Sequence, residues 1–435
     1  MKLRLLWSLT FLAAVLGAAE PVQLIAGRPT DGTLDLSMLC RESQTVTVEC
    51  GDRRLPVTLK ANQTATIRLD GLTPDARIDY RIVLPDGTTQ AFSSHTRRRP
   101  GEAFVFALQG DSHPERPHQF EPAAYRRTLS RVAADRPDFY FLLGDDFSVD
   151  TLKVLNRDTV EALYRNQRDY LAALGVPLFV VNGNHEQAAR CNLDGTAGNV
   201  AVWARNAREK YFPQPGPDEF YTGDPELTPH IGLARDYFAW EWGDALFVVL
   251  DPYWHSPVAA DNRLGSRDKF PDPWGATLGE AQYRWLGETL ARSRAKYKFI
   301  LIHHLNGRGR GGIECATLYE WGGRNRKGVA GFAIHRPGWE LPIHDLLVKH
   351  RVSAVFQGHD HIYARQELDG IAYFTLPLPA GPAGFAENSE AYRSGKIIPG
   401  PGYLRVKVAP AAAEVEFVSG LTGEILDRLQ LANKE

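Results

Sequence analysis

The fold is decided by residues 137–146, which read Pro137-Asp138-Phe139-Tyr140-Phe141-Leu142-Leu143-Gly144-Asp145-Asp146. An apolar run of aromatic and branched side chains stops at Gly144 and is followed by two carboxylates. This pattern predicts a buried strand that ends in a tight loop and presents Asp145 at its C-terminal end. Many parallel strands end in Gly-Asp, so the weight of the interpretation depends on how often the pattern recurs.

Four other apolar runs, at residues 103–108, 177–181, 297–302 and 352–356, end in similar polar motifs. These motifs are Gly110-Asp111-Ser112-His113, Asn182-Gly183-Asn184-His185-Glu186, His303-His304 and Gly358-His359-Asp360-His361. Ligands of open α/β sheets bind outside the C-terminal ends of the strands. We therefore expect these polar side chains to meet around Asp145 and to hold a pair of metal ions.

Length and charge are those of an ordinary globular protein. A chain of 435 residues can bury one large core and a smaller one, which predicts two domains. The net charge is −2 and the charged residues are evenly spread, which argues against a role as a nucleic-acid scaffold.

The first nineteen residues form a secretory signal pattern. They combine Lys2 and Arg4 with an apolar middle, residues 5–16, and the small residues Gly17-Ala18-Ala19. We expect residues 1–19 to be a signal peptide, which would make the mature protein periplasmic or secreted. An uncleaved anchor helix is the alternative, but the apolar run is short for a span of about 20 residues. No later stretch has the length and hydropathy to cross a membrane.

Four cysteines in an exported chain suggest disulfides. Three pairings are open. In one of them, Cys40–Cys50 would clip neighbouring strands of the small domain and Cys191–Cys315 would tie two loops of the large one. Four buried thiols are the alternative.

Residues 20–97 predict a small all-β sandwich. Short alternating segments such as 64–69 and 80–84 are separated by turn signals, including Asp70-Gly71 and Pro85-Asp86-Gly87.

A basic linker follows, and from residue 98 to 435 apolar strands alternate with amphipathic stretches at 120–134, 158–174, 279–292 and 343–350. That alternation predicts an α/β layered domain. Residues 244–250 form a further core strand, and residues 403–408 and 413–418 look like antiparallel strands that complete a second sheet. Two long insertions, 190–240 and 306–339, are the loops most suited to cover a site.

Taken in order, the five motifs resemble those of the calcineurin-like metallophosphoesterase superfamily, in particular its purple acid phosphatase-like branch with an N-terminal fibronectin III-like domain. The resemblance covers residues 20–435. It implies an α+β four-layer sandwich of two mixed sheets flanked by helices, and a cofactor of two divalent or trivalent metal ions. Carboxylate, amide and imidazole ligands in mixture suit Fe, Mn or Zn.

The resemblance also implies a role for each motif residue. The first metal would be held by Asp111, His113, Asp145 and His361, and the second by Asp145, Asn184, His303 and His359. We choose His303 rather than His304 because it directly ends its strand. His185 would lie over the metals, orient the substrate phosphate together with Asn184, and protonate the leaving oxygen.

One position departs from the family pattern. Three residues after the bridging aspartate, relatives carry a metal-bound tyrosine or an aspartate that supports the catalytic histidine, whereas this chain has Ser148. Support for His185 must then come from Asp146, Asp150 or Glu186. Arg308 and Arg310 follow a metal-binding strand and are candidate phosphate ligands, with a solvated loop as the alternative. His255, at the end of a core strand, is a further candidate, with a structural role as the alternative.

We expect an exported phosphoric ester hydrolase in which a metal-activated hydroxide attacks a phosphomonoester. A phosphodiesterase or nucleotidase on the same centre is the first alternative. A secreted binding protein with an inert core is the second, but degenerate cores lose ligands and this chain retains the full set.

Overall fold

The structure is a computed structural model that describes residues 21–258, 273–307 and 309–433. The expected signal peptide, residues 1–19, and the candidate Arg308 lie outside the described residues. Within the described part of the chain, no helix combines the length and hydropathy that crossing a membrane requires.

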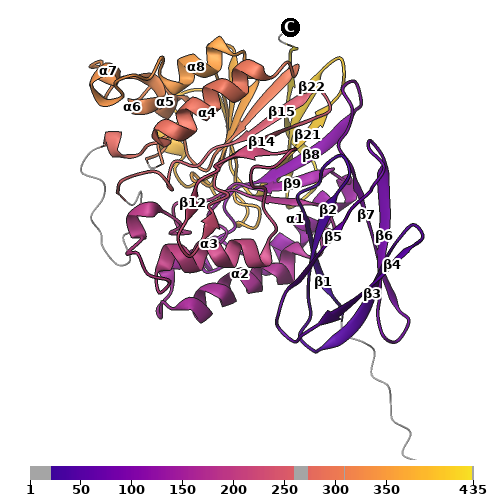
Figure 1. The fold of residues 1–435 in the computed structure, drawn as a ribbon. Helices are drawn as coiled ribbons and strands as arrows, with labels where there is room; N and C mark the ends of the chain where they lie inside the picture. The colour runs from indigo at the N-terminus through magenta and orange to yellow at the C-terminus, as the bar shows by residue number, and fades with distance from the viewer. Residues whose placement is uncertain (1–20, 259–272, 308, 434–435) are drawn as a thin grey trace, which may run out of the picture.

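Residues 21–103 form an antiparallel β-sandwich, as the sequence predicts (Figure 1). One sheet has the order β1-β2-β5 and the other β4-β3-β6-β7. The strands are β1 Gln23–Gly27, β2 Leu34–Leu39, β3 Gln44–Cys50, β4 Arg53–Leu59, β5 Ala65–Leu69, β6 Arg77–Val83 and β7 Thr89–His95. Alternate residues of β6 are buried, which gives this strand one face toward the shared core and one toward solvent.

The rest of the chain is built on two mixed sheets. The first has the order β10-β9-β8-β21-β22-β23 and the second β11-β14-β15-β16-β17-β19-β18-β20. Strands of the first are β8 Phe104–Gln109, β9 Phe139–Leu142, β10 Leu178–Val180, β21 Gly402–Val408, β22 Ala413–Ser419 and β23 Ile425–Leu431. Strands of the second are β11 Thr222–Gly223, β14 Phe238–Trp242, β15 Ala245–Val249, β16 Tyr297–Leu301, β17 Ala354–Gln357, β18 Tyr363–Leu368, β19 Ile371–Thr375 and β20 Lys396–Ile398.

Helices cover the outer faces of both sheets and complete four layers (Figure 1). Those on the first sheet are α1 Pro122–Asp135, α2 Arg157–Leu171 and α3 Val200–Tyr211, and the larger ones on the second are α4 Gly279–Arg292 and α8 Ile343–Lys349. Between the sheets lies an aromatic core that includes Phe106, Phe139, Phe247, Phe299 and Phe356. The predicted four-layer sandwich with an N-terminal all-β region is therefore confirmed.

Local sequence explains where the helices begin. At the start of α2, the side chain of Asn156 accepts a hydrogen bond from the Thr159 amide, and the Thr159 hydroxyl lies 3.1 Å from the Asn156 amide. This reciprocal capping box satisfies backbone donors that a helix start leaves unpaired. Pro122 opens α1, where a missing amide proton costs nothing.

The tail and the insertions add to this frame. The predicted tail strands are β21 and β22; β21 pairs with β8, so they extend the sheet that carries the first motif. The insertion at 190–240 contains α3 and a hairpin of β12 Leu227–Thr228 and β13 Gly232–Leu233. The insertion at 306–339 contains three short helices, α5 Ile313–Ala316, α6 Tyr319–Gly322 and α7 Phe332–His335.

The expected disulfides are wrong. Cys50 and Cys315 have free thiols, which excludes both the Cys40–Cys50 and the Cys191–Cys315 pair. The Cys40 thiol donates to the carbonyl of Glu42 and the Cys315 thiol to that of Arg310. The buried-thiol alternative holds for Cys315, because its surroundings supply an acceptor without a bridge.

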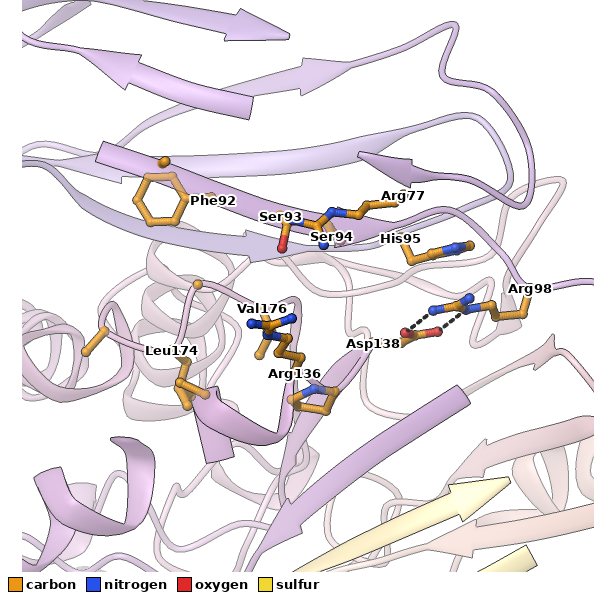
Figure 2. A pocket seen from close by; sticks show the side chains of 15 residues that line it. Arg77, Phe92, Ser93, Ser94, His95, Arg98, Arg136, Asp138, Leu174 and Val176 are labelled. Atoms are coloured by element: carbon orange, nitrogen blue, oxygen red, sulfur yellow. Dashed lines mark hydrogen bonds and ion pairs between the residues drawn. The ribbon is translucent and has the colours of Figure 1, made fainter. Parts of the chain in front are cut away.

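A cavity of about 480 Å³ lies between the sandwich and the layered domain (Figure 2). It is lined on one side by β7 residues such as Phe92 and His95, and on the other by Arg136 and Leu174. At the edge of the cavity, the guanidinium of Arg98 donates to both carboxylate oxygens of Asp138 at 2.8 and 2.9 Å. This ion pair connects the segment that follows β7 to the residue that precedes β9. None of the predicted metal ligands lines this cavity.

Candidate metal centre

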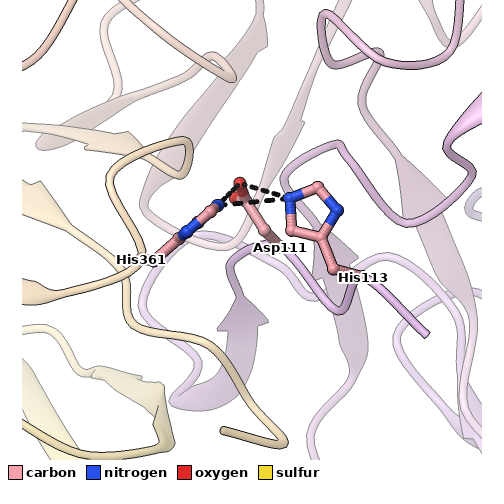
Figure 3. A group of neighbouring side chains, drawn as sticks. All are labelled: Asp111, His113 and His361. Carbon is pink, nitrogen blue, oxygen red and sulfur yellow. Dashed lines mark hydrogen bonds and ion pairs between the residues drawn. The ribbon is translucent and has the colours of Figure 1, made fainter. Parts of the chain in front are cut away.

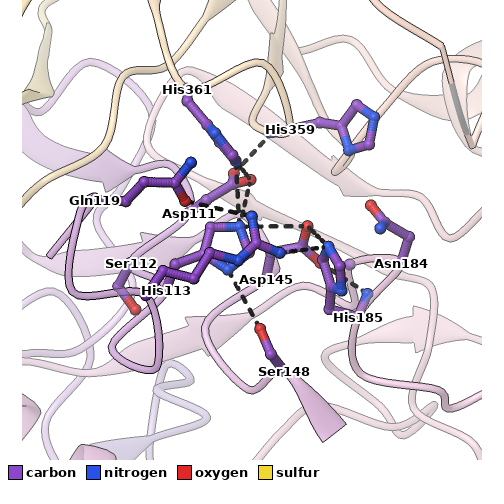
Figure 4. Close-up of polar contacts among 12 residues, drawn as sticks. Asp111, Ser112, His113, Gln119, Asp145, Ser148, Asn184, His185, His359 and His361 are labelled. Carbon is purple, nitrogen blue, oxygen red and sulfur yellow. Dashed lines mark hydrogen bonds and ion pairs between the residues drawn. The ribbon is translucent and has the colours of Figure 1, made fainter. Parts of the chain in front are cut away.

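The C-terminal ends of five strands carry the five motifs, and Figure 4 shows side chains from four of these motifs gathered around Asp145. In the first sheet, β8, β9 and β10 run parallel to one another, and in the second, β16 runs parallel to β17. The two sheets pack face to face, so their C-terminal edges bring motifs from distant parts of the chain together. The centre is thus positioned by rigid strands and built from the short loops that follow them.

The first group of side chains comprises Asp111, His113 and His361 (Figure 3). Asp111 Oδ2 lies 3.0 Å from His361 Nε2 and 3.6 Å from His113 Nε2. The two imidazole nitrogens lie 3.2 Å apart. Asp111 and His113 are fully buried and His361 is 4 % exposed, so the described residues shield all three from solvent.

The second group comprises Asp145, His303 and His359, with Asn184 beside them. His303 Nε2 lies 3.1 Å from Asp145 Oδ2, 3.0 Å from Asn184 Oδ1 and 3.2 Å from His359 Nδ1. Asp145 Oδ2 also lies 3.9 Å from His113 Nε2 of the first group. Asp145 therefore stands between the two groups, where a bridging ligand would be required.

Outer hydrogen bonds set which nitrogen of each histidine faces inward. The outer nitrogen of His303 contacts the Leu143 carbonyl at 2.7 Å, and that of His359 contacts the Gly309 carbonyl at 3.1 Å. The outer nitrogen of His113 contacts the Glu115 carboxylate at 3.0 Å, and that of His361 contacts the Glu387 carboxylate at 3.1 Å. A carbonyl or carboxylate oxygen can only accept, so the outer nitrogen carries a proton, and the inner nitrogen has a lone pair whenever the ring is neutral. Contacts of this kind orient metal-binding histidines.

Both carboxylates are held by the backbone. Asp111 Oδ1 accepts from the His359 amide at 2.7 Å, and Asp145 Oδ1 accepts from the His185 amide at 2.9 Å. In each case Oδ2 is left to face the imidazoles. The buried Oδ2 of Asp111 has no hydrogen-bond partner among the described residues. A buried carboxylate oxygen without a donor is costly, and a cation would satisfy it.

The backbone is strained at these positions. Asp145, His113, His359 and His361 have φ values of 58°, 43°, 70° and 61°, in the left-handed region that non-glycine residues seldom adopt. The neighbouring Gly183 has no room for a side chain, because a Cβ there would lie 2.2 Å from Asp145 Oδ1. Strain and close approach together aim the side chains into one small volume.

The electrostatics of the centre favour positive charge. Burial opposes ionisation of Asp111 and Asp145, but nearby imidazoles, His303 foremost, outweigh it and hold the pKa of both carboxyls well below the usual range. The same carboxylates outweigh burial at His303 and raise its pKa to about 10. Burial lowers the pKa of His359 well below its ordinary value, which keeps that imidazole neutral and able to bind a metal.

His185 lies beside the two groups and is held from both sides. Its Nδ1 lies 2.8 and 2.9 Å from the two oxygens of Asp150, and its Nε2 lies 3.8 Å from Asp145 Oδ2. Of the three candidates for its support, Asp150 is therefore the one in contact. Asp146 instead accepts from Gln109, and Glu186 accepts from the amides of Asp146, Phe147 and Gly183.

Ser148, the residue that differs from the family pattern, contacts none of the inward-facing nitrogen and oxygen atoms of the centre. Its hydroxyl donates to Glu115 at 2.6 Å and lies 3.2 Å from the outer nitrogen of His113 (Figure 4). Ser148 and Glu115 together fix the orientation of His113 from behind. The residue therefore supports a ligand rather than acting as one.

Arg116 is a residue that the sequence analysis missed. Its Nη2 lies 2.8 Å from His185 Nε2, and its Nε lies 3.2 Å from Glu115. The side chain is 22 % exposed, so the guanidinium borders both the buried centre and solvent. The available signal was its place three residues after His113, within the loop that follows β8, but an arginine in a loop has no distinctive spacing.

The remaining candidates lie apart from the two groups. The two nitrogens of His304 have no hydrogen-bond partner among the described residues, and its ring packs against that of His359, with Asp360 also nearby. Arg310 donates to the carbonyl of His359 and lies 3.3 Å from Asp360, and it lines a separate cavity of about 970 Å³. His255 neighbours Asp224 and Asp236 instead.

The donor set fits metal ions. The inner nitrogens of four imidazoles face two carboxylates and an amide oxygen, and two pairs of these nitrogens are only 3.2 Å apart. Two such nitrogens cannot donate to each other, so only a cation or a proton between them makes the contact favourable. Mixed imidazole, carboxylate and amide donors suit Fe, Mn or Zn better than Mg or Ca.

Comparison with known proteins agrees with this geometry. The family model of the calcineurin-like phosphoesterases matches residues 104–363. Among solved structures, a purple acid phosphatase from yellow lupin (Lupinus luteus) seeds aligns with a TM-score of 0.63 at 14 % identity, over 95 % of this chain and 74 % of its own. PhoD aligns with a TM-score of 0.63 at 15 % identity, over 96 % of this chain and 90 % of its own.

No curated protein sequence matches this chain. The two structural likenesses concern the fold, whereas the family model spans more than half of the chain and includes β8, β9, β10, β16 and β17 with their motifs. The chain belongs to the calcineurin-like phosphoesterase family and is a metal-dependent phosphoesterase.

Proposed function

We propose that this protein is a phosphomonoesterase with two metal ions held on either side of Asp145. The observation that carries the proposal is the position of Asp145 Oδ2, 3.1 Å from His303 Nε2 of one group and 3.9 Å from His113 Nε2 of the other. A single carboxylate between two sets of inward-facing nitrogens is what a bridged pair of ions requires.

The ligands follow from the two groups. One ion would be held by Asp111, His113, Asp145 and His361, and the other by Asp145, Asn184, His303 and His359. When bound, the pair would supply Lewis acidity, which activates water and neutralises the charge that develops on the phosphoryl oxygens. The protein keeps the ligands in place through the outer hydrogen bonds of the imidazoles and the backbone contacts of the carboxylates.

His185 is suited to protonate the leaving oxygen. Burial lowers its affinity for a proton, but Asp145 and Asp150 outweigh burial and raise the pKa to about 9, which favours a proton on Nε2 once that nitrogen is free of Arg116. Asp150 fixes the ring through Nδ1 and leaves Nε2 to face the substrate. A positioned general acid of this kind contributes about 10²–10⁴-fold in rate.

Arg116 is suited to bind the substrate phosphate. In the structure its guanidinium points at His185 Nε2, which can act as acceptor only when that nitrogen carries no proton. A phosphate oxygen is a better acceptor for a guanidinium than an imidazole is. We infer that Arg116 contacts the phosphate when substrate is bound, which frees His185 Nε2 to carry its proton.

Two further proposals concern the N-terminal part. We propose that residues 20–97 form a domain of fibronectin III type, supported by seven strands in a three-plus-four arrangement, and that residues 98–435 form the second domain. We also propose export through the signal pattern in residues 1–19. Mass spectrometry of the mature protein from its native host would find Glu20 as the first residue, and an intact residue 1–19 segment would contradict export.

The central experiment measures hydrolysis of p-nitrophenyl phosphate and of its bis-ester after loading with Mn²⁺, Zn²⁺ or Fe²⁺. We expect the monoester to be the better substrate. Asp145→Asn should lose the metal of the strand-end centre together with activity, and His185→Asn should lose activity while retaining that metal. Asp138→Asn is the matched control, because Asp138 is a buried carboxylate at the opposite end of β9 and should leave metal content unchanged. Full hydrolysis by metal-depleted Asp145→Asn would refute the proposal.

A further inference from the structure

We propose that Asp224, Asp236 and His255 form a third, mononuclear site for a divalent cation, separate from the strand-end centre. One ligand atom from each residue lies within 4.8 Å of the others. None of the three belongs to the two groups around Asp145.

The fold brings these residues together from three places. Asp224 directly follows β11, and Asp236 lies two residues before β14, which pairs antiparallel with β11 through Gly223 and Phe238. The Asp224 amide donates to the carbonyl of Tyr237, so the pairing continues up to the two carboxylates. His255 comes from the loop that follows β15 and reaches them from the neighbouring strand.

Asp224 and Asp236 are buried, the His255 side chain is 9 % exposed, and each of the three carries an atom without a hydrogen-bond partner among the described residues. Asp236 is 1 % exposed, and neither of its oxygens has a hydrogen-bond partner among the described residues. Asp224 Oδ1 accepts from the Glu226 amide, but its Oδ2 has no such partner. His255 Nε2 lies 3.3 Å from Asp236 Oδ2 and 3.7 Å from Asp224 Oδ2. Buried carboxylates without donors are expensive, and their oxygens here converge on one point.

An ion triplet centred on a protonated His255 explains the arrangement less well. Charge-assisted hydrogen bonds from a nitrogen to a carboxylate are about 2.7–2.9 Å long, whereas both separations here are longer. One imidazolium would also leave two buried carboxylates with a net negative charge. The neighbouring Arg190 is already paired with Glu226 and lies over Trp254. A divalent cation with neutral His255 brings the net charge of the group to zero.

The ligand types indicate the cation. One imidazole and two carboxylates are typical of Zn²⁺ or Mn²⁺, whereas Ca²⁺ and Mg²⁺ prefer oxygen ligands alone. Such an ion would clip the insertion at 190–240 to the end of β15. Trp254, beside His255, packs with Val202, Ile231 and Ala234 of that insertion, and the Tyr253 ring lies 6.0 Å from the His303 ring. The clip would therefore steady a wall next to the strand-end centre.

Metal stoichiometry tests the site. Full-length protein is loaded with Zn²⁺, freed of excess metal by gel filtration and measured by inductively coupled plasma mass spectrometry. We expect Asp236→Asn to bind one equivalent less than the unaltered protein while keeping phosphomonoesterase activity. Glu226→Gln is the matched control, because it removes a neighbouring carboxylate outside the cluster and should leave the stoichiometry unchanged. Equal stoichiometry in Asp236→Asn and the unaltered protein would overturn the proposal.

A second pair of variants covers the case in which Asp236→Asn does not fold. Asp145→Asn should keep one Zn²⁺ equivalent after losing those of the strand-end centre, and the double variant with His255→Gln should lose that last equivalent. Retention of the last equivalent in the double variant would also overturn the proposal. Loss of activity in Asp145→Asn concerns the strand-end centre alone, so the two proposals fail independently.

Discussion

Buried carboxylates occur in two very different settings in this protein. At the strand-end centre, Asp111 and Asp145 face neutral or titrating imidazoles, and Asp111 Oδ2 lacks any donor among the described residues. On the outer strands β22 and β23, the buried Glu416 contacts Arg405, Lys407 and Arg428 at 2.6 to 3.0 Å, and the buried Asp427 contacts Arg365 and Lys396 at 2.6 and 2.7 Å.

The difference separates function from stability. Permanent cations already neutralise Glu416 and Asp427, so these carboxylates need nothing from outside the chain. The carboxylates at the centre have only histidines, whose charge depends on protons, so they are poised for an external cation. Backbone strain follows the same division: Asp145, His113, His359 and His361 have positive φ values, whereas Glu416 and Asp427 do not. At the strand-end centre, backbone strain therefore coincides with carboxylates that lack a permanent cation.

The largest effect is expected from a change in the first group. Asp111→Asn should reduce metal content and abolish phosphomonoesterase activity, because the amide brings a donor to the point where Oδ2 faces His113 and His361. Activity with p-nitrophenyl phosphate and metal analysis of the purified variant would measure this. Full activity with normal metal content would show that Asp111 is a structural carboxylate like Glu416.

A smaller loss is expected at Arg116, for which we propose a contact with the substrate phosphate and not with the metals. Arg116→Ala should lower kcat/KM by about 10²-fold, the size of effect seen when one preorganised charge donor is removed, and should leave metal content unchanged. Arg116→Lys keeps the charge but loses the two parallel donors of the guanidinium, so its kcat/KM should lie between those of Arg116→Ala and the unaltered protein. A normal kcat/KM in Arg116→Ala would confine the arginine to a role in positioning Glu115.

Asp150 acts through His185 and should show itself in the pH profile. With a pKa of about 9, His185 is protonated below that pH and loses its proton as the pH rises through it. Asp150→Asn removes the negative charge that faces His185 Nδ1. The pKa of His185 should fall, and the basic limb of the kcat profile should move to lower pH. The rate near neutral pH should fall by about 10-fold, as for other residues that orient a functional histidine. An unmoved basic limb would contradict this role.

Much of the strand-end centre could be predicted from the sequence, because its side chains follow directly after apolar strands. Apolar runs predicted β8, β9, β10, β16 and β17 to within two residues, and their closing motifs brought Asp111, Asp145 and the histidines together. The spacing of apolar residues along the chain is a local property that packing does not change. The helices α1, α2, α4 and α8 were predicted for the same reason.

What could not be read depends on the direction of side chains in three dimensions. Asp146, Asp150 and Glu186 all lie near the motifs in sequence, but the short turn at residues 149–151 is what brings Asp150 to His185, while Asp146 turns away toward Gln109. Arg116 and the convergence of Asp224, Asp236 and His255 follow from loop paths that no periodicity records. The cysteine pairs were wrong because counting cysteines says nothing of the distances between them.

The smallest effect on activity is expected at Glu416, where the comparison predicts a change in stability alone. Burial opposes its ionisation, but Lys407 and Arg405 outweigh burial and lower the pKa to about 2. A carboxylate with a lowered pKa stabilises the folded state above its unfolded pKa of about 4.3, and the contribution is lost as the pH falls through about 2. Glu416→Gln should therefore reduce the free energy of unfolding by about 2 kcal/mol at pH 7, and by less as the pH falls below about 4. Denaturant unfolding at pH 7 and pH 3 would measure this, with kcat on p-nitrophenyl phosphate unchanged. A loss of kcat without a loss of stability would mean that the carboxylates of the outer strands are coupled to the centre after all.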